Sequence, residues 1–196
     1  MKKNILVVDD SALMRRVECD IINSDNKFKV TDTCKDGLEA LEKLRTKKYD
    51  GVVLDINMPR MDGLELLQQL QKEKIKANIV MASTLTVEGA NEAIKSLELG
   101  AIDFVTKPSN IIEAKGDAFK KALLDVLYAA TKARVHFKKP SLVVAADKTA
   151  AASVNRLKKP GQNKIIAIAS STGGPKALQS VIPKIPADID APVVLV

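Results

Sequence analysis

The stretch "DGVVLDINMPRMDG", Asp50–Gly63, joins a short apolar run to an acidic residue and then to a turn containing asparagine, proline and glycine. A β-branched run bounded in this way predicts a buried strand. Four similar runs occur before Pro108, namely "NILVVDD", "KVTDTCKDG", "ANIVMAST" and "AIDFVTKP". Between them, leucines and alanines recur at three- and four-residue spacing, which is typical of helices. The alternation predicts a doubly wound α/β fold with a five-stranded parallel sheet.

Polar side chains come at the carboxyl ends of four of these strands, where ligands bind in open α/β sheets. They are Asp9 and Asp10 after the first strand, Asp55 after the third, Ser83 after the fourth and Lys107 after the fifth. Two carboxylates about 4 Å apart repel by roughly 4 kcal/mol at an effective dielectric constant near 20, so three at one edge require a cation. Carboxylate oxygens favour Mg²⁺, which can bring in a phosphoryl group. A lysine and a hydroxyl could hold phosphoryl oxygens while a carboxylate attacks phosphorus.

Each of these residues also has a purely structural interpretation. Asp10 followed by Ser11 fits a helix N-cap, Asp55 fits turn chemistry, and Lys107 before Pro108 fits the end of a strand. As one half of an exposed ion pair, Lys107 is expected to contribute only about 0 to 1 kcal/mol to stability. The joint placement of the residues at strand ends nevertheless favours the functional interpretation.

The motifs "VVDD", "LDINMPRMDGLELL", "MAST" and "DFVTKP" resemble, in order and spacing, those of response-regulator receiver domains, over about residues 1–125. The resemblance implies a flavodoxin-like receiver in which Asp55 accepts phosphate. It also implies that Asp10, Asp55 and the backbone carbonyl of Asn57 bind Mg²⁺, and that Asp9 supports the metal site.

The same resemblance implies roles around the phosphate. Ser83 matches the phosphate-sensing hydroxyl and Lys107 the phosphate-pairing lysine, with a cis peptide bond expected before Pro108. Phe104 occupies the aromatic switch position, and an ordinary core aromatic is the alternative interpretation.

A basic, weakly periodic segment follows the last helix predicted for the receiver. The net charge is −1 over residues 1–108, +7 over 109–162 and +1 over 163–196. Residues 138–162 are rich in alanine, lysine and serine, which is typical of a linker. We expect no nucleic-acid binding, because the basic segment has no interleaved aromatics and too few residues follow it for a DNA-binding domain.

A strand Ile165–Ala169, the turn "SSTGG" and a helix beginning near Pro175 are predicted after the linker. The stretch "IIAIASSTGGPKAL" resembles the start of the catalytic domain of chemotaxis protein-glutamate methylesterases. Ser171 matches the nucleophile that, in this family, attacks methyl-glutamate side chains of chemoreceptors. The family's glycine and alanine before that serine are replaced here by Ala169 and Ser170. "IKSLELGAIDFVTKP" in the receiver also resembles this family more than other regulators.

The resemblance implies that a sensor histidine kinase phosphorylates Asp55 and that phosphorylation activates an esterase. The esterase would demethylate glutamate, and deamidate glutamine, in the cytoplasmic domains of chemoreceptors. Such an enzyme needs serine, histidine and aspartate. The only histidine is His136, near the linker, and the sequence reaches Val196 just where the family's histidine would be approached.

We therefore expect a receiver at 1–125, a helix extension and linker at 126–162, and an incomplete second α/β domain at 163–196. We expect no useful esterase activity from the chain as given. The alternatives are a non-catalytic, phosphorylation-dependent binding module and another kind of two-component response regulator.

The expected location is the cytoplasm. No apolar run approaches the roughly 18 residues of a membrane span, so membrane insertion is not expected, and the N-terminus becomes acidic where a signal peptide would stay apolar. Cys19 and Cys34 lack metal-ligand spacing and are expected to be reduced thiols inside the fold.

Overall fold

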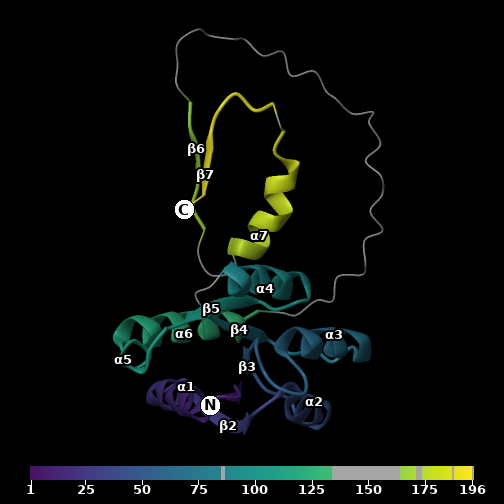
Figure 1. The fold of residues 1–196 in the computed structure, drawn as a ribbon, viewed down its shortest axis with the longest axis vertical. Helices are drawn as coiled ribbons and strands as arrows, with labels where there is room; N and C mark the ends of the chain where they lie inside the picture. The colour runs from purple at the N-terminus through teal and green to yellow at the C-terminus, as the bar shows by residue number, and fades with distance from the viewer. Residues whose placement is uncertain (85–86, 134–163, 171–173, 187, 196) are drawn as a thin grey trace.

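The computed structural model describes residues 1–84, 87–133, 164–170, 174–186 and 188–195 (Figure 1). Five parallel strands form one sheet in the order β2-β1-β3-β4-β5. They are β1 (Lys3–Val8), β2 (Phe28–Cys34), β3 (Gly51–Asp55), β4 (Ile79–Thr84) and β5 (Asp103–Lys107). This order places a switch point between β1 and β3, as in flavodoxin-like folds. The predicted fold class is confirmed.

Helices cover both faces of this sheet (Figure 1). They are α1 (Ala12–Ser24), α2 (Gly37–Thr46), α3 (Gly63–Glu73), α4 (Val87–Glu98), α5 (Ile111–Ala114) and α6 (Asp117–Ala130). Successive strand residues point to opposite faces. Leu6 and Val8 therefore pack with α2, α3 and α4, whereas Ile5 and Val7 pack with α1 and α6. The helix predicted to complete the receiver buries Phe119, Leu123 and Leu127, as its spacing indicates.

Side-chain caps fix the start of each helix that follows one of the first three strands. The Ser11 hydroxyl accepts a hydrogen bond from the Met14 amide at 3.3 Å, which makes Ser11 the N-cap of α1. Asp36 caps α2 in the same way, and Asp62 forms a reciprocal capping box with Glu65 at α3. Such caps satisfy amides that the helix itself leaves unpaired, so the short loops at this edge have defined geometry.

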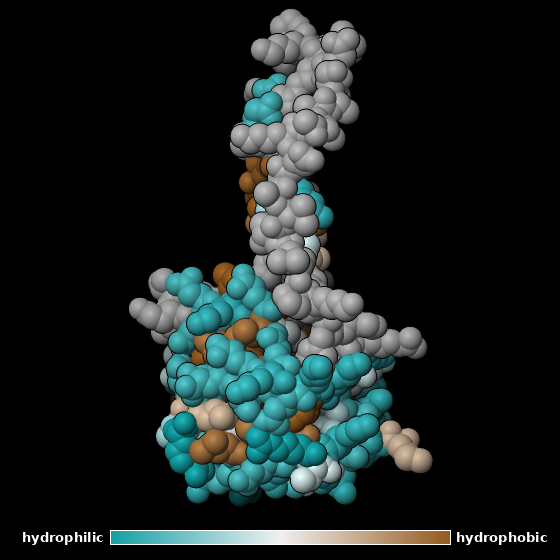
Figure 2. All heavy atoms as spheres, turned by 90° about the vertical axis from the view of Figure 1, so that its right-hand side faces the viewer, coloured by the Kyte–Doolittle hydropathy of each residue, from teal (hydrophilic) through white to brown (hydrophobic). Residues whose placement is uncertain are grey.

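The surface of the receiver on the side of α2 and α3 is mainly hydrophilic (Figure 2). Apolar side chains appear there only as small separate patches between polar ones. Cys34 is buried and Cys19 is half-buried, and both are free thiols, as expected. None of the helices in the described part of the chain has the length and apolar composition that a membrane span requires.

A second, two-stranded sheet lies near the C-terminus. The parallel strands β6 (Ile166–Ile168) and β7 (Val193–Leu195) are joined through α7 (Gly174–Val181) and a 3₁₀ helix at Ile182–Lys184. Helix α7 contacts α4 of the receiver. From residue 164 onward, none of the residues whose exposure the structure describes is buried.

The strand and helix predicted around the "SSTGG" turn are therefore present, with bounds that differ by one or two residues. A Cβ atom at Gly174 would lie only 2.3 Å from the Cβ atom of Ser170. Glycine at 174 thus leaves room for the side chain at position 170. The linker, His136 and Ser171 lie outside the described residues.

Candidate phosphoacceptor and metal site

Acidic and basic side chains from three strand ends meet at the carboxyl edge of the sheet. The Lys107 Nζ atom lies 2.6 Å from Asp9 Oδ2 and 2.8 Å from Asp55 Oδ1. One carboxylate oxygen from each of Asp9, Asp10 and Asp55 lies within 4.8 Å of the other two. The structure therefore brings together the acidic residues and the lysine that the sequence analysis selected.

Most of this cluster is buried, so the charge on each group strongly affects the pKa of its neighbours. Asp9 is fully buried, Asp55 is 6% exposed and Lys107 is 8% exposed, whereas Asp10 faces solvent. Burial raises the pKa of Asp55, and Lys107 only partly offsets this effect. Burial also disfavours the Lys107 ammonium, but the Asp55 and Asp9 carboxylates outweigh it, so the pKa of Lys107 lies above its ordinary value.

The expectation that Lys107 forms an exposed pair is therefore wrong. A lysine near a strand end could have pointed into solvent, but its stem is enclosed and its ammonium faces two buried carboxylates. With Asp9 it forms a close ion pair, in which Lys107 Nζ lies 2.6 Å from Asp9 Oδ2. Removing the ammonium would leave two uncompensated buried charges, which is costly.

The donor set fits a hard divalent cation. With all carboxylates ionised, Asp9, Asp10 and Asp55 together with Lys107 carry two excess negative charges, which one divalent ion neutralises. Oxygen-only ligands and a partly open site, with room for water, suit Mg²⁺ better than softer metals.

Backbone amides orient the two buried carboxylates. Asp9 Oδ1 accepts a hydrogen bond from the Ser11 amide at 2.8 Å, and Asp55 Oδ1 accepts one from the Ile56 amide at 2.8 Å. Because Asp55 uses Oδ1 for both Ile56 and Lys107, its Oδ2 is the oxygen left for an incoming group.

Ser83 and Phe104 occupy the strands on the far side of Asp55. The Ser83 hydroxyl is buried and donates a hydrogen bond of 2.9 Å to the Gly89 carbonyl, so it links β4 to α4. Phe104 is half-buried and packs against the apolar cluster shared by α2, α3 and α4. Both residues thus connect the edge of the sheet with the helices beside it.

The peptide bond before Pro108 is trans, and no peptide bond in the described part of the chain is cis. This corrects the expectation drawn from the receiver resemblance. The trans isomer of a bond before proline is intrinsically favoured by about 0.5 to 1 kcal/mol. Lys107 reaches both carboxylates from this trans geometry.

The loop between β3 and α3 is tied to α2. Arg60 has a left-handed backbone conformation (φ 67°), and its Nε donates to the buried Asp36 carboxylate at 2.8 Å. The Gly37 amide donates to the Met61 carbonyl at 3.0 Å. These contacts fix the loop that carries the Asn57 carbonyl.

Sequence analysis did not identify two residues beneath the site. The guanidinium of Arg15 donates a hydrogen bond of 2.6 Å to the Asp9 carbonyl. Glu18 is fully buried, and neither of its carboxylate oxygens has a hydrogen-bonding partner within the described residues. Burial first, and Asp9 second, raises the pKa of Glu18 from 4.5 to about 8. An acidic residue within the apolar stripe of α1 was the available signal.

Comparison with known proteins agrees with this geometry. Residues 5–115 match the family described as "Response regulator receiver domain", and residues 166–196 match "CheB methylesterase". The match to the receiver family covers more than half of the chain, so the chain belongs to the response regulators. Within them it is CheB-like: a chemotaxis receiver followed by part of a methylesterase domain.

The similar relatives are methylesterases of bacteria and archaea. Protein-glutamate methylesterase/protein-glutamine glutaminase 1 of Syntrophomonas wolfei is 40% identical over 199 residues, which cover 100% of this chain and 55% of the relative. The Bacillus subtilis protein-glutamate methylesterase/protein-glutamine glutaminase is 38% identical over 98% of this chain and 55% of its own length. The chain thus spans about half the length of these relatives.

A solved structure supports the receiver assignment. The response regulator domain of Thermotoga maritima CheB is 38% identical, has a TM-score of 0.58, and covers 68% of this chain and 99% of its own. The receiver domain of NarL from Mycobacterium tuberculosis, at 23% identity and a TM-score of 0.57, shares the fold.

Proposed function

We propose that the receiver takes a phosphoryl group from a sensor histidine kinase onto Asp55. The observation that carries the proposal is the convergence of three carboxylates within 4.8 Å, with Lys107 against two of them. Asp55 Oδ2 would form the new oxygen–phosphorus bond as the nitrogen–phosphorus bond of a phosphohistidine breaks. The departing imidazole nitrogen then takes up a proton.

Mg²⁺ would be held by Asp10, Asp55 and the Asn57 carbonyl, with Asp9 positioning the acidic set. When bound, the ion would neutralise charge on the phosphoryl oxygens. Lys107 would move its pairing from Asp55 to a phosphoryl oxygen. Ser83 would exchange its bond to the Gly89 carbonyl for one to the phosphoryl group, and Phe104 would follow α4 and β5.

Phosphorylation with a small acyl phosphate tests the assignment. Labelling of the protein, located by mass spectrometry, should require Mg²⁺ and should disappear in Asp55→Asn. Asp20→Asn is the matched control, because Asp20 is an exposed aspartate of α1 that pairs only with Arg16 in the described part of the chain. Undiminished labelling of Asp55→Asn, or full labelling in excess chelator, would contradict the proposal.

The activity that phosphorylation would regulate is proposed from the similarity to methylesterases. We infer that residues 1–125 form the receiver, 126–162 an extension and linker, and 163–196 the beginning of a catalytic domain with Ser171 as nucleophile. In a protein that contains the remaining catalytic residues, phosphorylation would stimulate removal of methyl groups from chemoreceptor glutamates in the cytoplasm. The alternative is a binding module that responds to phosphorylation without catalysis.

Methanol release separates these two outputs. A protein that joins residues 1–196 to the remainder of a methylesterase domain should release methanol from methylated chemoreceptor fragments, and Ser171→Ala should abolish the release. If such a protein is phosphorylated on Asp55 but releases no methanol, the binding-module alternative holds.

A further inference from the structure

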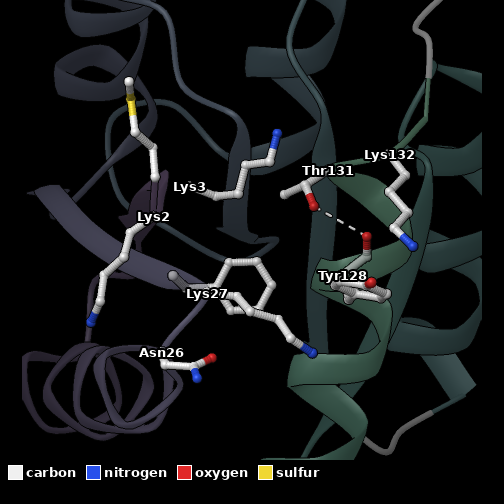
Figure 3. Close-up of a pocket in the computed structure, with 9 residues that line it drawn as sticks. Lys2, Lys3, Asn26, Lys27, Tyr128, Thr131 and Lys132 are labelled. Carbon is white, nitrogen blue, oxygen red and sulfur yellow. Dashed lines mark hydrogen bonds between the residues drawn. The ribbon is translucent and has the colours of Figure 1, made fainter.

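A basic hollow lies at the end of the sheet opposite to Asp55, where β1 and β2 begin and α6 ends (Figure 3). The hollow is open to solvent and has a volume of about 710 Å³. Its lining includes Lys2, Lys3, Lys27, Tyr128 and Lys132. Segments far apart in the sequence thus contribute four lysines and an aromatic ring to one concave surface.

Most of this positive charge is not neutralised within the described residues. Lys3 pairs with Asp50 at 3.3 Å, but Lys2, Lys27 and Lys132 form no ion pair there. The C-terminal end of α6 contributes a partial negative charge of only about half a unit, so the hollow stays positive.

Two of the lysines are held against one ring. The Nζ atoms of Lys27 and Lys132 lie 4.6 Å and 3.9 Å from the centroid of Tyr128. Lys132, and then Lys27, lowers the pKa of the Tyr128 hydroxyl. The face of the ring attracts each ammonium, which partly offsets the repulsion between the two lysines and limits their freedom.

The backbone beneath these side chains is also fixed. The Lys3 amide donates to the Lys27 carbonyl at 2.7 Å, which joins the two strand ends. The Thr131 hydroxyl donates to the Tyr128 carbonyl at 3.1 Å, the bond drawn as a dashed line in Figure 3. Hydrogen bonds therefore hold the backbone near Lys3, Lys27 and Tyr128 in place.

We propose that this hollow, the Lys27–Tyr128–Lys132 pocket, binds a small anion that carries at least two linked phosphate groups. A lysine ammonium is a compact point charge that binds phosphate oxygens well. The ammonium groups of Lys27 and Lys132 both lie against the Tyr128 ring, so an extended polyanion can contact both of them. A chain of phosphates reaches more than one of these ammonium groups at once.

Titration calorimetry of the 196-residue protein with sodium tripolyphosphate, without Mg²⁺, tests the proposal. We expect saturable one-to-one binding that weakens as salt is added, because salt screens exposed charges. The double variant Lys27→Ala/Lys132→Ala should bind roughly tenfold more weakly or worse, as loss of about 1.4 kcal/mol predicts. The control Lys72→Ala/Lys95→Ala removes the same charge from exposed positions on α3 and α4 and should bind as the unmodified protein does.

Further binding measurements identify the ligand and distinguish this pocket from the phosphoacceptor site. Asp55→Asn should bind tripolyphosphate unchanged, since Asp55 lies at the other end of the sheet. If ATP binds as tightly as tripolyphosphate, the pocket recognises the phosphates alone. If ATP binds more tightly, the pocket also recognises the base.

Three results would overturn the proposal: no saturable binding at low salt, equal loss in the two double variants, or binding only to vesicles of phosphatidylglycerol and not to free tripolyphosphate. The last result would make the pocket a membrane-surface contact instead.

Discussion

Glu18 places a carboxyl group inside the receiver, close enough to the acidic site to sense its charge. Asp9 and Asp55 raise its pKa beyond the effect of burial, and Lys107 and Arg15 oppose them. With a pKa of about 8, the group is mainly protonated at neutral pH. A neutral acid at this position avoids adding a further negative charge beside the three carboxylates of the site.

The stability of the receiver should therefore fall with pH through Glu18. Its folded pKa of about 8 exceeds its ordinary value of 4.5, so the folded state binds the proton more tightly than the unfolded state. The proton on Glu18 stabilises the folded state fully below pH 4.5, and this stabilisation is lost as the pH rises through 8. In this window the unmodified protein should lose about 1.4 kcal/mol per pH unit more than Glu18→Gln does.

Denaturant unfolding at several pH values, in chelator, measures this difference. Chelator is needed because a bound cation would itself shift the titration. Asp20→Asn on the exposed side of the same helix is the control and should follow the unmodified protein. Parallel pH profiles for Glu18→Gln and the unmodified protein would show that Glu18 is ionised in the folded state.

At the scale of elements, the loop from β3 to α3 depends on close backbone packing. A Cβ atom on Gly63 would lie 2.3 Å from the Asp55 carbonyl oxygen and 3.1 Å from the Ile56 Cα atom. The Gly63 amide also donates to the Ile56 carbonyl at 2.8 Å. The start of α3 is thus packed directly onto the backbone of the proposed phosphoacceptor.

Gly63→Ala should destabilise the receiver by about 1 to 3 kcal/mol, as overpacking does, and should reduce the increase in melting temperature that Mg²⁺ causes. Gly51→Ala, at the other end of β3, is the matched control. Its Cβ would meet only side-chain atoms, the nearest being Leu127 Cδ1 at 3.0 Å, so the neighbours can adjust. The role given to Gly63 is wrong if both variants keep the same response to Mg²⁺.

The sequence alone predicted the elements well because strand and helix periodicity differ, and it predicted the acidic edge because parallel strands end together. A helix N-cap was expected at Asp10–Ser11, and Ser11 is the residue that forms it. Burial of Lys107 and Glu18 could not be predicted, since it depends on how long side chains are enclosed by other elements. The ion pair of Arg60 with Asp36 joins residues separated by 24 positions, and no local pattern encodes it.

At the scale of the whole molecule, the excess positive charge and the buried apolar residues lie in different parts of the chain. The excess of basic residues lies in 109–162, at the end of the receiver and beyond it. The buried apolar clusters, in contrast, end at Ala130 among the described residues. The described residues after 163 therefore contribute little to the apolar core.

Removal of residues 134–196 should leave the receiver almost as stable as it is in the full chain. Both apolar clusters are retained in full, and none of the α7 residues whose exposure the structure describes is buried. Thermal unfolding of residues 1–133 should give a melting temperature within about 2 °C of the receiver transition in the full chain, because 1 kcal/mol corresponds to a few degrees at this size.

Leu127→Ala calibrates that measurement. Leu127 is fully buried near the end of α6, and its truncation should cost about 2 to 5 kcal/mol in either length of protein. If the shortened protein melts as early as Leu127→Ala, the C-terminal segment must cover apolar surface of the receiver. The receiver's core would then depend on its neighbour, and phosphorylation at Asp55 could alter the stability of both parts together. If residues 1–133 and the full chain melt at the same temperature, any coupling between the receiver and the C-terminal segment must act through the contact of α7 with the surface of α4. Ser83 would then take part in that coupling, because its hydroxyl hydrogen-bonds to Gly89 in α4 from the edge of the sheet.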